Sequence, residues 1–155
     1  MEIALTGEYD CKLDAKGRLR LPSGLLKQLS VLESDVFIIN RGYENHLMLY
    51  PEAVWEKKTK EINQLNINVK DHRKAIRYFF RGASKVQIDG NERVLLSKAL
   101  LDYADIEREV VLFAYQEQIE IWDKKAYETM LDEEPENFSE LAEKIWGGDS
   151  LSKEQ

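Results

Sequence analysis

Four positively charged side chains surround one short turn near the start of the chain. They lie within nine residues of one another and are Lys12, Lys16, Arg18 and Arg20. Lysine and arginine can neutralise phosphate groups, and arginine can also form two hydrogen bonds to one base edge. The alternative is a solvated turn with no function, because Asp14-Ala-Lys-Gly is itself a favourable turn sequence. The residue types and spacing therefore indicate an anion-binding site and leave the simpler explanation open.

The segments on either side of this turn alternate in polarity, which is typical of strands. Residues 8–13 and 18–22 are predicted to pair as the two arms of one β-hairpin. Gly17 can adopt the positive φ that a short hairpin loop needs. Side chains near such a turn project furthest from the core, which favours Lys16 and Arg18 as the outermost cations.

The composition limits which classes of protein are possible. The chain has 155 residues and a net charge of −7, and residues 124–155 contribute nine acids against four bases. The acidity is therefore mainly a property of the tail, and a local basic site remains possible. No apolar run is long enough to span a membrane, and the N-terminus does not resemble a signal peptide. Cys11 is the only cysteine, which fits a cytoplasmic protein.

The pattern of elements appears twice. After the first strands the sequence predicts a short helix from Ser23, two strands at 35–40 and 45–51, and helices over 51–66 and 69–82. From Gly82 the order strand, strand, helix, strand, strand, helix begins again. Gly7 corresponds to Gly82 and Asp14 to Asp89, at an offset of 75 residues that falls to 72 later in the chain. This is an internal duplication, with three residues missing near the strand–strand loops of the second copy.

The duplication predicts the domain boundaries. We expect residues 1–81 to form the first repeat with its following helices, and residues 82–146 to form the second repeat with a C-terminal helix. Each half is expected to be only marginally stable alone, so pairing of the halves would complete the core. The C-terminal helix has an apolar side formed by Phe138, Leu141, Ile145 and Trp146. Residues 147–155 are predicted to be a disordered tail.

The two copies and their turn resemble the MraZ family of bacterial transcriptional regulators and, more broadly, AbrB-like swapped-hairpin proteins. The resemblance covers about residues 7–146 and is carried by GEYDCKLDAKGRLRLP, LMLYPEAVWE, RYFFRGASKVQID and IEIWDKKAYE. It implies an α+β fold: a tandem-duplicated, pseudo-twofold swapped-hairpin β-barrel with flanking helices. It also implies a sequence-specific DNA-binding protein, located in the cytoplasm and associated with the nucleoid.

The resemblance carries further expectations about partners and residues. It implies a ring-shaped homo-oligomer that binds direct repeats in double-stranded DNA and represses the division and cell-wall gene cluster, with a methyltransferase as a possible partner. The family's DNA-recognition motif matches Asp14 and Arg18, and we expect the carboxylate to orient the guanidinium through a charge-assisted hydrogen bond. The other expected DNA-binding residues are Lys12, Lys16, Gly17 and Arg20.

The second copy departs from this motif. It keeps Asp89 and Arg93, but Asn91 and Glu92 stand where the first copy has lysine and glycine. A carboxylate at this turn should be repelled by phosphate. The sequence therefore suggests that the first copy reads DNA and the second serves structure or subunit contacts. Asp89 and Arg93 could instead keep a residual DNA contact.

Other residues give weaker signals. His46 and His72 lack metal-site spacing and are expected to be ordinary surface or interface residues, so neither a metal nor a cofactor is expected. Cys11 is expected to be a small buried residue rather than a nucleophile. Residues 71–82 mix cations with Tyr78, Phe79 and Phe80; they could form a second nucleic-acid surface, but a solvated basic face with core aromatics is the simpler interpretation.

Three classes of function compete for this chain. The DNA-binding regulator requires that Arg18 and its neighbours determine binding. A protein-interaction scaffold with little or no DNA binding is the alternative, favoured by the acidic total and the altered second turn. An enzyme is not expected, because no nucleophile–base pair, paired carboxylates or phosphate-binding glycine loop is assembled by the sequence.

Overall fold

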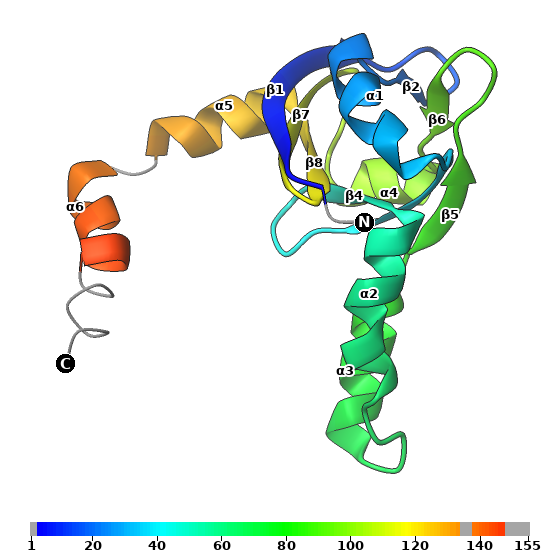
Figure 1. Ribbon diagram of the computed structural model, residues 1–155, viewed down its shortest axis with the longest axis vertical. Helices are drawn as coiled ribbons and strands as arrows, with labels where there is room; N and C mark the ends of the chain where they lie inside the picture. Colours follow the sequence, from blue (N-terminus) through cyan, green and yellow to red (C-terminus); the bar gives the residue numbers. More distant parts are fainter. Residues whose placement is uncertain (1–2, 134–137, 148–155) are drawn as a thin grey trace. The chain divides into compact units, whose positions relative to one another are not determined.

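The computed structural model describes residues 3–133 and 138–147 of the chain. It divides into two compact units, residues 1–124 and residues 125–155. The first unit contains both sheets and is the larger (Figure 1). The predicted tail lies outside the described residues from position 148 onward. No helix in the described ranges has the length and apolar character needed to cross a bilayer.

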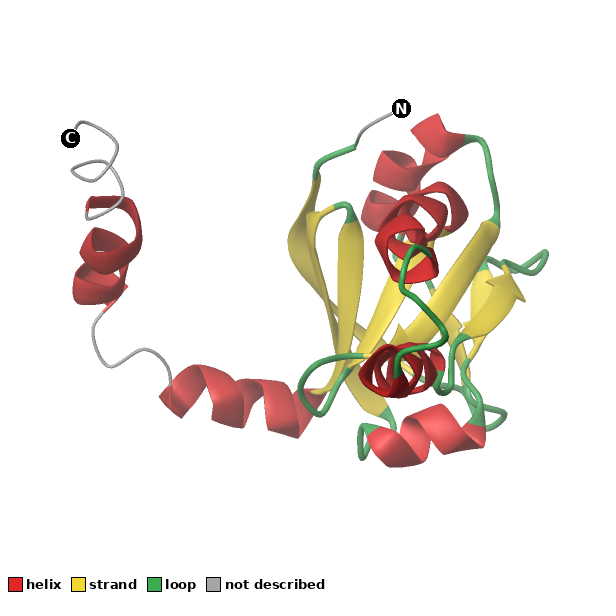
Figure 2. Ribbon diagram, turned by 90° about the horizontal axis from the view of Figure 1, so that it is seen from below, coloured by secondary structure: helices red, strands yellow, loops and turns green. Residues whose placement is uncertain are grey.

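The strands follow the order that the duplication predicts. They are β1 (Leu5–Lys12), β2 (Arg18–Arg20), β3 (Val36–Arg41), β4 (Leu47–Pro51), β5 (Ser84–Gln87), β6 (Arg93–Leu95), β7 (Glu109–Gln116) and β8 (Gln118–Asp123). Six of them form an antiparallel sheet in the order β1-β7-β8-β4-β3-β5, and β2 pairs with β6 in a separate ribbon. Figure 2 draws the strands in yellow and the helices in red. The six-stranded sheet is open, with β1 and β5 at its edges, so no barrel closes among the described residues.

The helices lie where proline, small polar residues and apolar periodicity indicated. They are α1 (Ser23–Leu29), α2 (Glu52–Asn63), α3 (Lys70–Phe80), α4 (Lys98–Tyr103), α5 (Lys124–Glu133) and α6 (Phe138–Ala142). A 3₁₀ turn, η1 (Ser30–Leu32), follows α1, and a π-helical turn, η2 (Glu143–Gly147), follows α6. The described chain is therefore mixed α+β, as predicted.

The two repeats exchange their first strands. β1 of the first copy pairs with β7 of the second along its full length, and β5 of the second copy pairs with β3 of the first. The strand order consequently reads the same from either edge, with corresponding strands at equal positions. The core is shared between copies, which gives a physical reason why neither half is expected to be stable alone.

The predicted local hairpin is wrong in its pairing. Residues 8–13 and 18–22 do flank a tight turn, but only a single bridge, between Leu13 and Leu19, joins its arms. Beyond that bridge β1 continues into the large sheet, whereas β2 leaves to pair with β6. The physical reason is burial: Leu19 and Val94 are each 0 % exposed where β2 meets β6, which a local hairpin could not achieve.

Backbone conformation supports the duplication independently of side chains. Gly7 and Gly82 have φ angles of 126° and 83°, and Glu33 and Asp105 have φ angles of 52° and 51°. Positive φ is uncommon outside glycine, so its recurrence at matching positions of both copies reflects a shared fold. The connections between the last two strands also differ: residues 42–46 join β3 to β4, whereas Glu117 alone joins β7 to β8.

Helices α2 and α3 run together away from the sheet (Figure 1). Trp55 of α2 stacks on Phe79 at 5.5 Å between ring centroids and meets Phe80 edge-on at 5.8 Å. We expected the aromatic residues of this segment to lie in the core. Phe79 and Phe80 meet this expectation only in part, because both are half-buried. It is wrong for Tyr78, whose exposure is 70 %.

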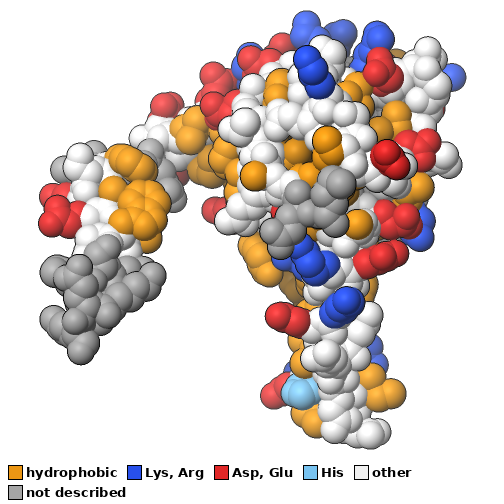
Figure 3. All heavy atoms as spheres, viewed as in Figure 1, with side chains coloured by type: hydrophobic (Ala, Val, Ile, Leu, Met, Phe, Trp, Pro, Cys, Tyr) orange, Lys and Arg blue, Asp and Glu red, His pale blue; other side chains and the backbone are white. Residues whose placement is uncertain are grey.

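The second unit contains the predicted amphipathic helix. Phe138, Leu141, Ile145 and Trp146 are all exposed, and the rings of the first and last lie 6.4 Å apart. Figure 3 shows hydrophobic side chains gathered on one side of this segment. The apolar side exists as the 3.6-residue period indicated.

Candidate nucleic-acid interface

The first turn is held by the side chain of Asp14. Its Oδ1 accepts hydrogen bonds from the backbone N–H groups of Lys16 and Arg18, both at 2.9 Å. The backbone N–H of Gly17 donates to the Asp14 carbonyl at 3.0 Å, with Gly17 at a φ of 80°. Aspartate suits this position because its short carboxylate reaches N–H groups two and four residues on.

The same carboxylate orients Arg18. The Nε of Arg18 donates to Asp14 Oδ2 at 2.7 Å, so the expected charge-assisted hydrogen bond is present. The Arg18 side chain is 30 % exposed. A guanidinium has five N–H donors, and this bond uses one of them. The remaining donors are held in a defined orientation at the surface.

The second turn repeats this arrangement atom for atom. Oδ1 of Asp89 accepts from the backbone N–H groups of Asn91 and Arg93 at 2.8 and 2.9 Å, and its Oδ2 accepts from Arg93 Nε at 2.9 Å. Glu92 occupies the position of Gly17 with a φ of 63°. The Asp–Arg pair that the two copies share therefore stabilises the turn in each of them.

The two turns are joined through the β2–β6 ribbon. Its register places Leu19 opposite Val94, both fully buried, and Arg20 opposite Arg93. Side chains alternate across a strand, so the neighbours of the two buried residues share the outer face. That outer face, here called the arginine ribbon, consists of Arg18, Arg20, Arg93 and Leu95.

Acidic groups partly neutralise the arginine ribbon across the repeat boundary. Glu92 Oε1 lies 3.7 Å from an Arg20 nitrogen, and Asp14 Oδ2 lies 3.8 Å from an Arg93 nitrogen. These long, exposed contacts stabilise little individually. Within residues 14–20 and 89–95, four cations (Lys16, Arg18, Arg20 and Arg93) accompany three carboxylates (Asp14, Asp89 and Glu92), so one net positive charge remains. Arg20 is the most accessible arginine of the ribbon's ion pairs, at 70 % exposure.

The other predicted residues lie around this face. Lys12 ends β1 opposite Glu109 and is exposed, and Lys16 is exposed within the turn. Cys11 packs partly against the core, and burial, with a smaller effect from Asp10, raises the pKa of its thiol to about 11. At neutral pH the group is therefore the protonated thiol and a poor nucleophile, in line with the expectation.

The hydrogen bonds at the two turns lower the pKa of both aspartates. For Asp14 the largest cause is the backbone N–H of Arg18, and for Asp89 it is the backbone N–H of Arg93. Because the folded pKa lies below the unfolded one, this stabilisation is present above about pH 4 and is lost as pH falls through the folded pKa.

We therefore expect the urea midpoint to fall between pH 5 and about pH 3 partly through these two groups. The variant Asp14→Asn/Asp89→Asn should be less stable at pH 7 and should show a shallower fall. Chemical denaturation at each pH measures both quantities. Asp102→Asn, which alters an exposed pair with Lys98, is the control for removing a carboxylate. An equal fall in the double variant and the native protein would contradict the assignment.

Two features of the surface were outside the reach of sequence reasoning. The pairing of β2 with β6 places Arg93 beside the first copy's arginines, although the sequence separated the two turns by 75 residues. His46, expected to be a surface or interface residue, is instead buried at 3 % exposure and stacks on Trp122. Its position just before the buried strand β4 was the available signal.

The fold and the arginine ribbon together define a class of protein: a duplicated, strand-exchanged α+β protein with a basic two-stranded ribbon at its surface. The profile of the family described as "MraZ protein, putative antitoxin-like" matches residues 4–77 and 79–147. The chain belongs to the MraZ family.

Named relatives support this assignment. A protein of Christiangramia forsetii is 43 % identical over 150 residues, covering 96 % of this chain and 97 % of the relative. One from Flavobacterium psychrophilum is 38 % identical over 92 % of each chain, and one from Cytophaga hutchinsonii is 33 % identical over 90 % of this chain and 92 % of the relative. All three are named transcriptional regulator MraZ, which is not the name of an enzyme.

Proposed function

We propose that this chain is a transcriptional regulator that binds duplex DNA through the arginine ribbon. One observation carries the proposal. Three arginines share the outer face of a two-stranded ribbon, and Arg20 stands directly opposite Arg93. Like charges directly across a ribbon are destabilising in isolation. A polyanion lying against this face would remove that repulsion.

The geometry suits the major groove of DNA. A two-stranded ribbon fits within that groove, and arginine can hold guanine through two hydrogen bonds. Arg20 and Arg18 are the proposed base readers, and Lys12 and Lys16 the proposed phosphate contacts. Arg93 is the weaker candidate because its guanidinium already lies near two carboxylates, those of Asp89 and Asp14. The first copy would then read DNA while the second supports it.

The finer features follow from the family resemblance. A single ribbon buries too little surface for tight specific binding, so we propose a ring-shaped homo-oligomer that engages direct repeats through several copies. We further propose repression of the division and cell-wall gene cluster, a cytoplasmic, nucleoid-associated location and a methyltransferase as a partner. The exchanged strands and palindromic sheet order support a pseudo-twofold swapped-hairpin unit, with residues 1–81 and 82–146 as its repeats.

Fluorescence anisotropy tests the proposal with a matched pair of variants. Arg18→Ala and Arg93→Ala remove the same Nε–carboxylate bond from equivalent turns, so their effects on folding should be similar. Duplexes would carry short tandem repeats from upstream of the gene or a scrambled sequence, at several salt concentrations. Arg18→Ala and Arg20→Ala should each lose about 10-fold or more of the preference for the repeats, and Arg93→Ala should keep it.

Each result has a distinct meaning. Equal losses for Arg93→Ala and Arg18→Ala would place both turns at the DNA and contradict the division of roles. Equally poor binding of the native protein to both duplexes, unchanged by Arg20→Ala, would remove the DNA proposal. The scaffold alternative would then hold. One observation favours that alternative: Glu92 carries negative charge into the ribbon, 3.7 Å from Arg20.

A further inference from the structure

Helix α3 carries a row of positive charge along one face. The cations follow one another at intervals of four, three and four residues. At about 100° and 1.5 Å per residue, these positions fall within an arc of about 60° and form a row about 16 Å long. All four side chains are exposed, and the row is here called the α3 stripe: Lys70, Lys74, Arg77 and Arg81.

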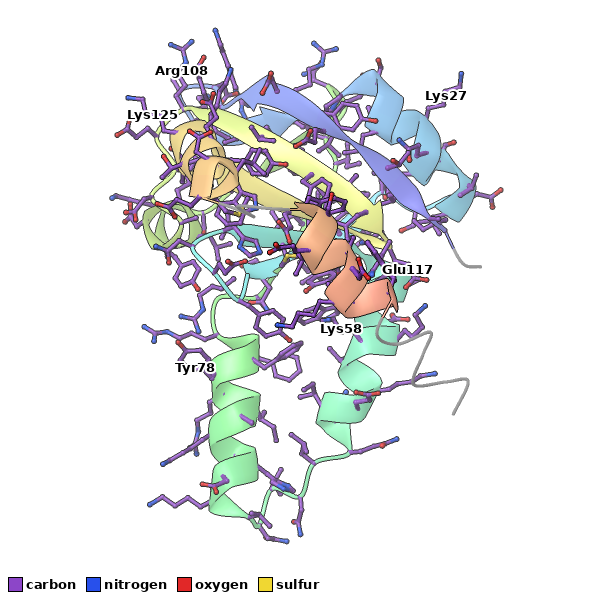
Figure 4. All side chains as sticks on the ribbon, turned by 90° about the vertical axis from the view of Figure 1, so that its left-hand side faces the viewer. Lys27, Lys58, Tyr78, Arg108, Glu117 and Lys125 are labelled. Carbon is purple, nitrogen blue, oxygen red and sulfur yellow. The ribbon has the colours of Figure 1, made fainter. Side chains whose placement is uncertain are left out.

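The opposite side of α3 is already occupied. Phe79 and Phe80 contact Trp55 of α2, with ring centroids 5.5 and 5.8 Å apart. The Tyr78 carbonyl accepts a hydrogen bond from Arg41 of β3 at 3.2 Å, which fixes this end of the helix to the sheet. Figure 4 shows α2 and α3 side by side, with Tyr78 on the side of α3 away from α2. The α3 stripe is therefore held on a firm support and faces away from α2.

The α3 stripe has few acidic neighbours. Residues 70–81 hold five cations and one acid, although the net charge of the whole chain is −7. Among residues 3–133 and 138–147, none of the four stripe side chains forms an ion pair. Helix α2 beside it has three acids and three lysines. Like charges three or four residues apart destabilise a helix, so a bound polyanion would remove a repulsion that α2 does not have.

The form of the surface favours duplex DNA among polyanions. Contacts to a phosphate backbone need only cations within reach and no pocket. Acidic proteins usually bind through apolar anchors seated in pockets, whereas the stripe is a row of charge on a convex helix. Single strands need aromatic faces for stacking, and the Tyr78 ring lies under Arg41 at 4.7 Å. A membrane-bound helix needs a free apolar side, and that of α3 packs on α2.

We propose that the α3 stripe binds the phosphate backbone of duplex DNA, whatever its base sequence, as a second DNA surface. Its lysines and arginines would neutralise phosphates, and the exposed Tyr78 beside them would add a hydroxyl donor. Strands β2 and β6 lie near the top of Figure 1, whereas α3 points to the bottom. The stripe and the arginine ribbon would therefore contact different segments of DNA. This binding goes beyond sequence reading by the ribbon and does not depend on it.

A matched pair of double variants tests the stripe in the full-length protein. Lys70→Gln/Lys74→Gln removes two charges from the stripe, and Lys57→Gln/Lys60→Gln removes two from exposed positions of α2. The α2 variant also breaks the exposed pair of Lys57 with Glu117, so it is the stricter control for stability. Fluorescence anisotropy would follow a labelled scrambled duplex and labelled poly-L-glutamate over a series of salt concentrations.

The stripe variant should bind the scrambled duplex about 10-fold or more weakly at low salt, with a slope of log K against log salt shallower by about 2, because two phosphate contacts are lost. The α2 variant should stay within about twofold of the native protein. Equal weakening in both variants, unchanged binding by the stripe variant, or no binding of the native protein to the scrambled duplex would each overturn the proposal. Poly-L-glutamate that binds as tightly as the duplex, and only with an intact stripe, would assign the surface to an acidic protein instead.

A third variant separates the stripe from the arginine ribbon. Arg18→Ala/Arg20→Ala should remove the preference for the tandem repeats and leave the effect of the stripe substitutions on the scrambled duplex as large as before. An unchanged preference for the repeats would contradict the role of the ribbon alone. Loss of the stripe effect in the ribbon variant would mean that the stripe is not an independent surface, and would overturn this second proposal alone.

Discussion

Replacing Leu19 with alanine is expected to lower the free energy of unfolding by about 3 kcal/mol. The side chain is 0 % exposed and lies opposite Val94 in the β2–β6 ribbon. It also pairs with Leu13 at the only bridge between the arms of the first turn. Truncating a buried leucine removes apolar contact and leaves a cavity, which typically costs 2–5 kcal/mol. Here the loss falls on one of the strands that pair across the two repeats.

Urea denaturation followed by circular dichroism would measure this effect. Arg20→Ala is the matched control, because Arg20 is the next residue of the same strand and is 70 % exposed. It should change the free energy of unfolding by less than about 0.5 kcal/mol. Equal losses in the two variants would show that β2 does not contribute to the core as the structure describes.

The second large effect is expected at Gly42, in the connection between β3 and β4. A Cβ at this position would overlap the imidazole of His46, with Nε2 the nearest atom and Cδ2 at 2.5 Å. Gly42→Ala must therefore displace the imidazole from its stack on Trp122 or shift the connection itself. Overpacking of this kind typically costs 1–3 kcal/mol, and we expect a loss of about 2–3 kcal/mol.

A double-mutant cycle isolates the clash from other effects of the alanine. If the imidazole is the obstacle, Gly42→Ala should cost much less in a His46→Ala background than in the native protein. The coupling should exceed about 1 kcal/mol, because the two residues are in contact. Additive losses would mean that Gly42 is required for its backbone conformation and not for the space it leaves to His46.

The sequence predicted what is encoded locally or repeated. The alternating runs, the proline and glycine boundaries and the duplicated motif together gave the order of elements and the location of both turns. The Asp14–Arg18 bond was also predictable, since a turn of this length brings an aspartate within reach of an arginine four residues on. These features depend on residues close together in the chain.

What the sequence did not provide is the choice of partner strand. A local hairpin is the simplest pairing for β1 and β2. Nothing in residues 8–22 indicates that each strand would pair more favourably with one between 73 and 111 residues away. Burial of Leu19 against Val94 favours the pairing of β2 with β6. This contact forms only once both repeats are folded. The same limit applies to His46, whose burial depends on Trp122 of the other copy.

The exchange of β1 and β5 between repeats has an evolutionary consequence. Two identical, unlinked copies could form the same interleaved unit as a symmetric dimer, but any mutation in one turn would then appear in both. Covalent linkage gives each turn its own codons. Gly17 and Glu92, at equivalent positions with φ angles of 80° and 63°, show the result. One copy has a glycine and the other a carboxylate, a difference that a single-repeat gene could not encode.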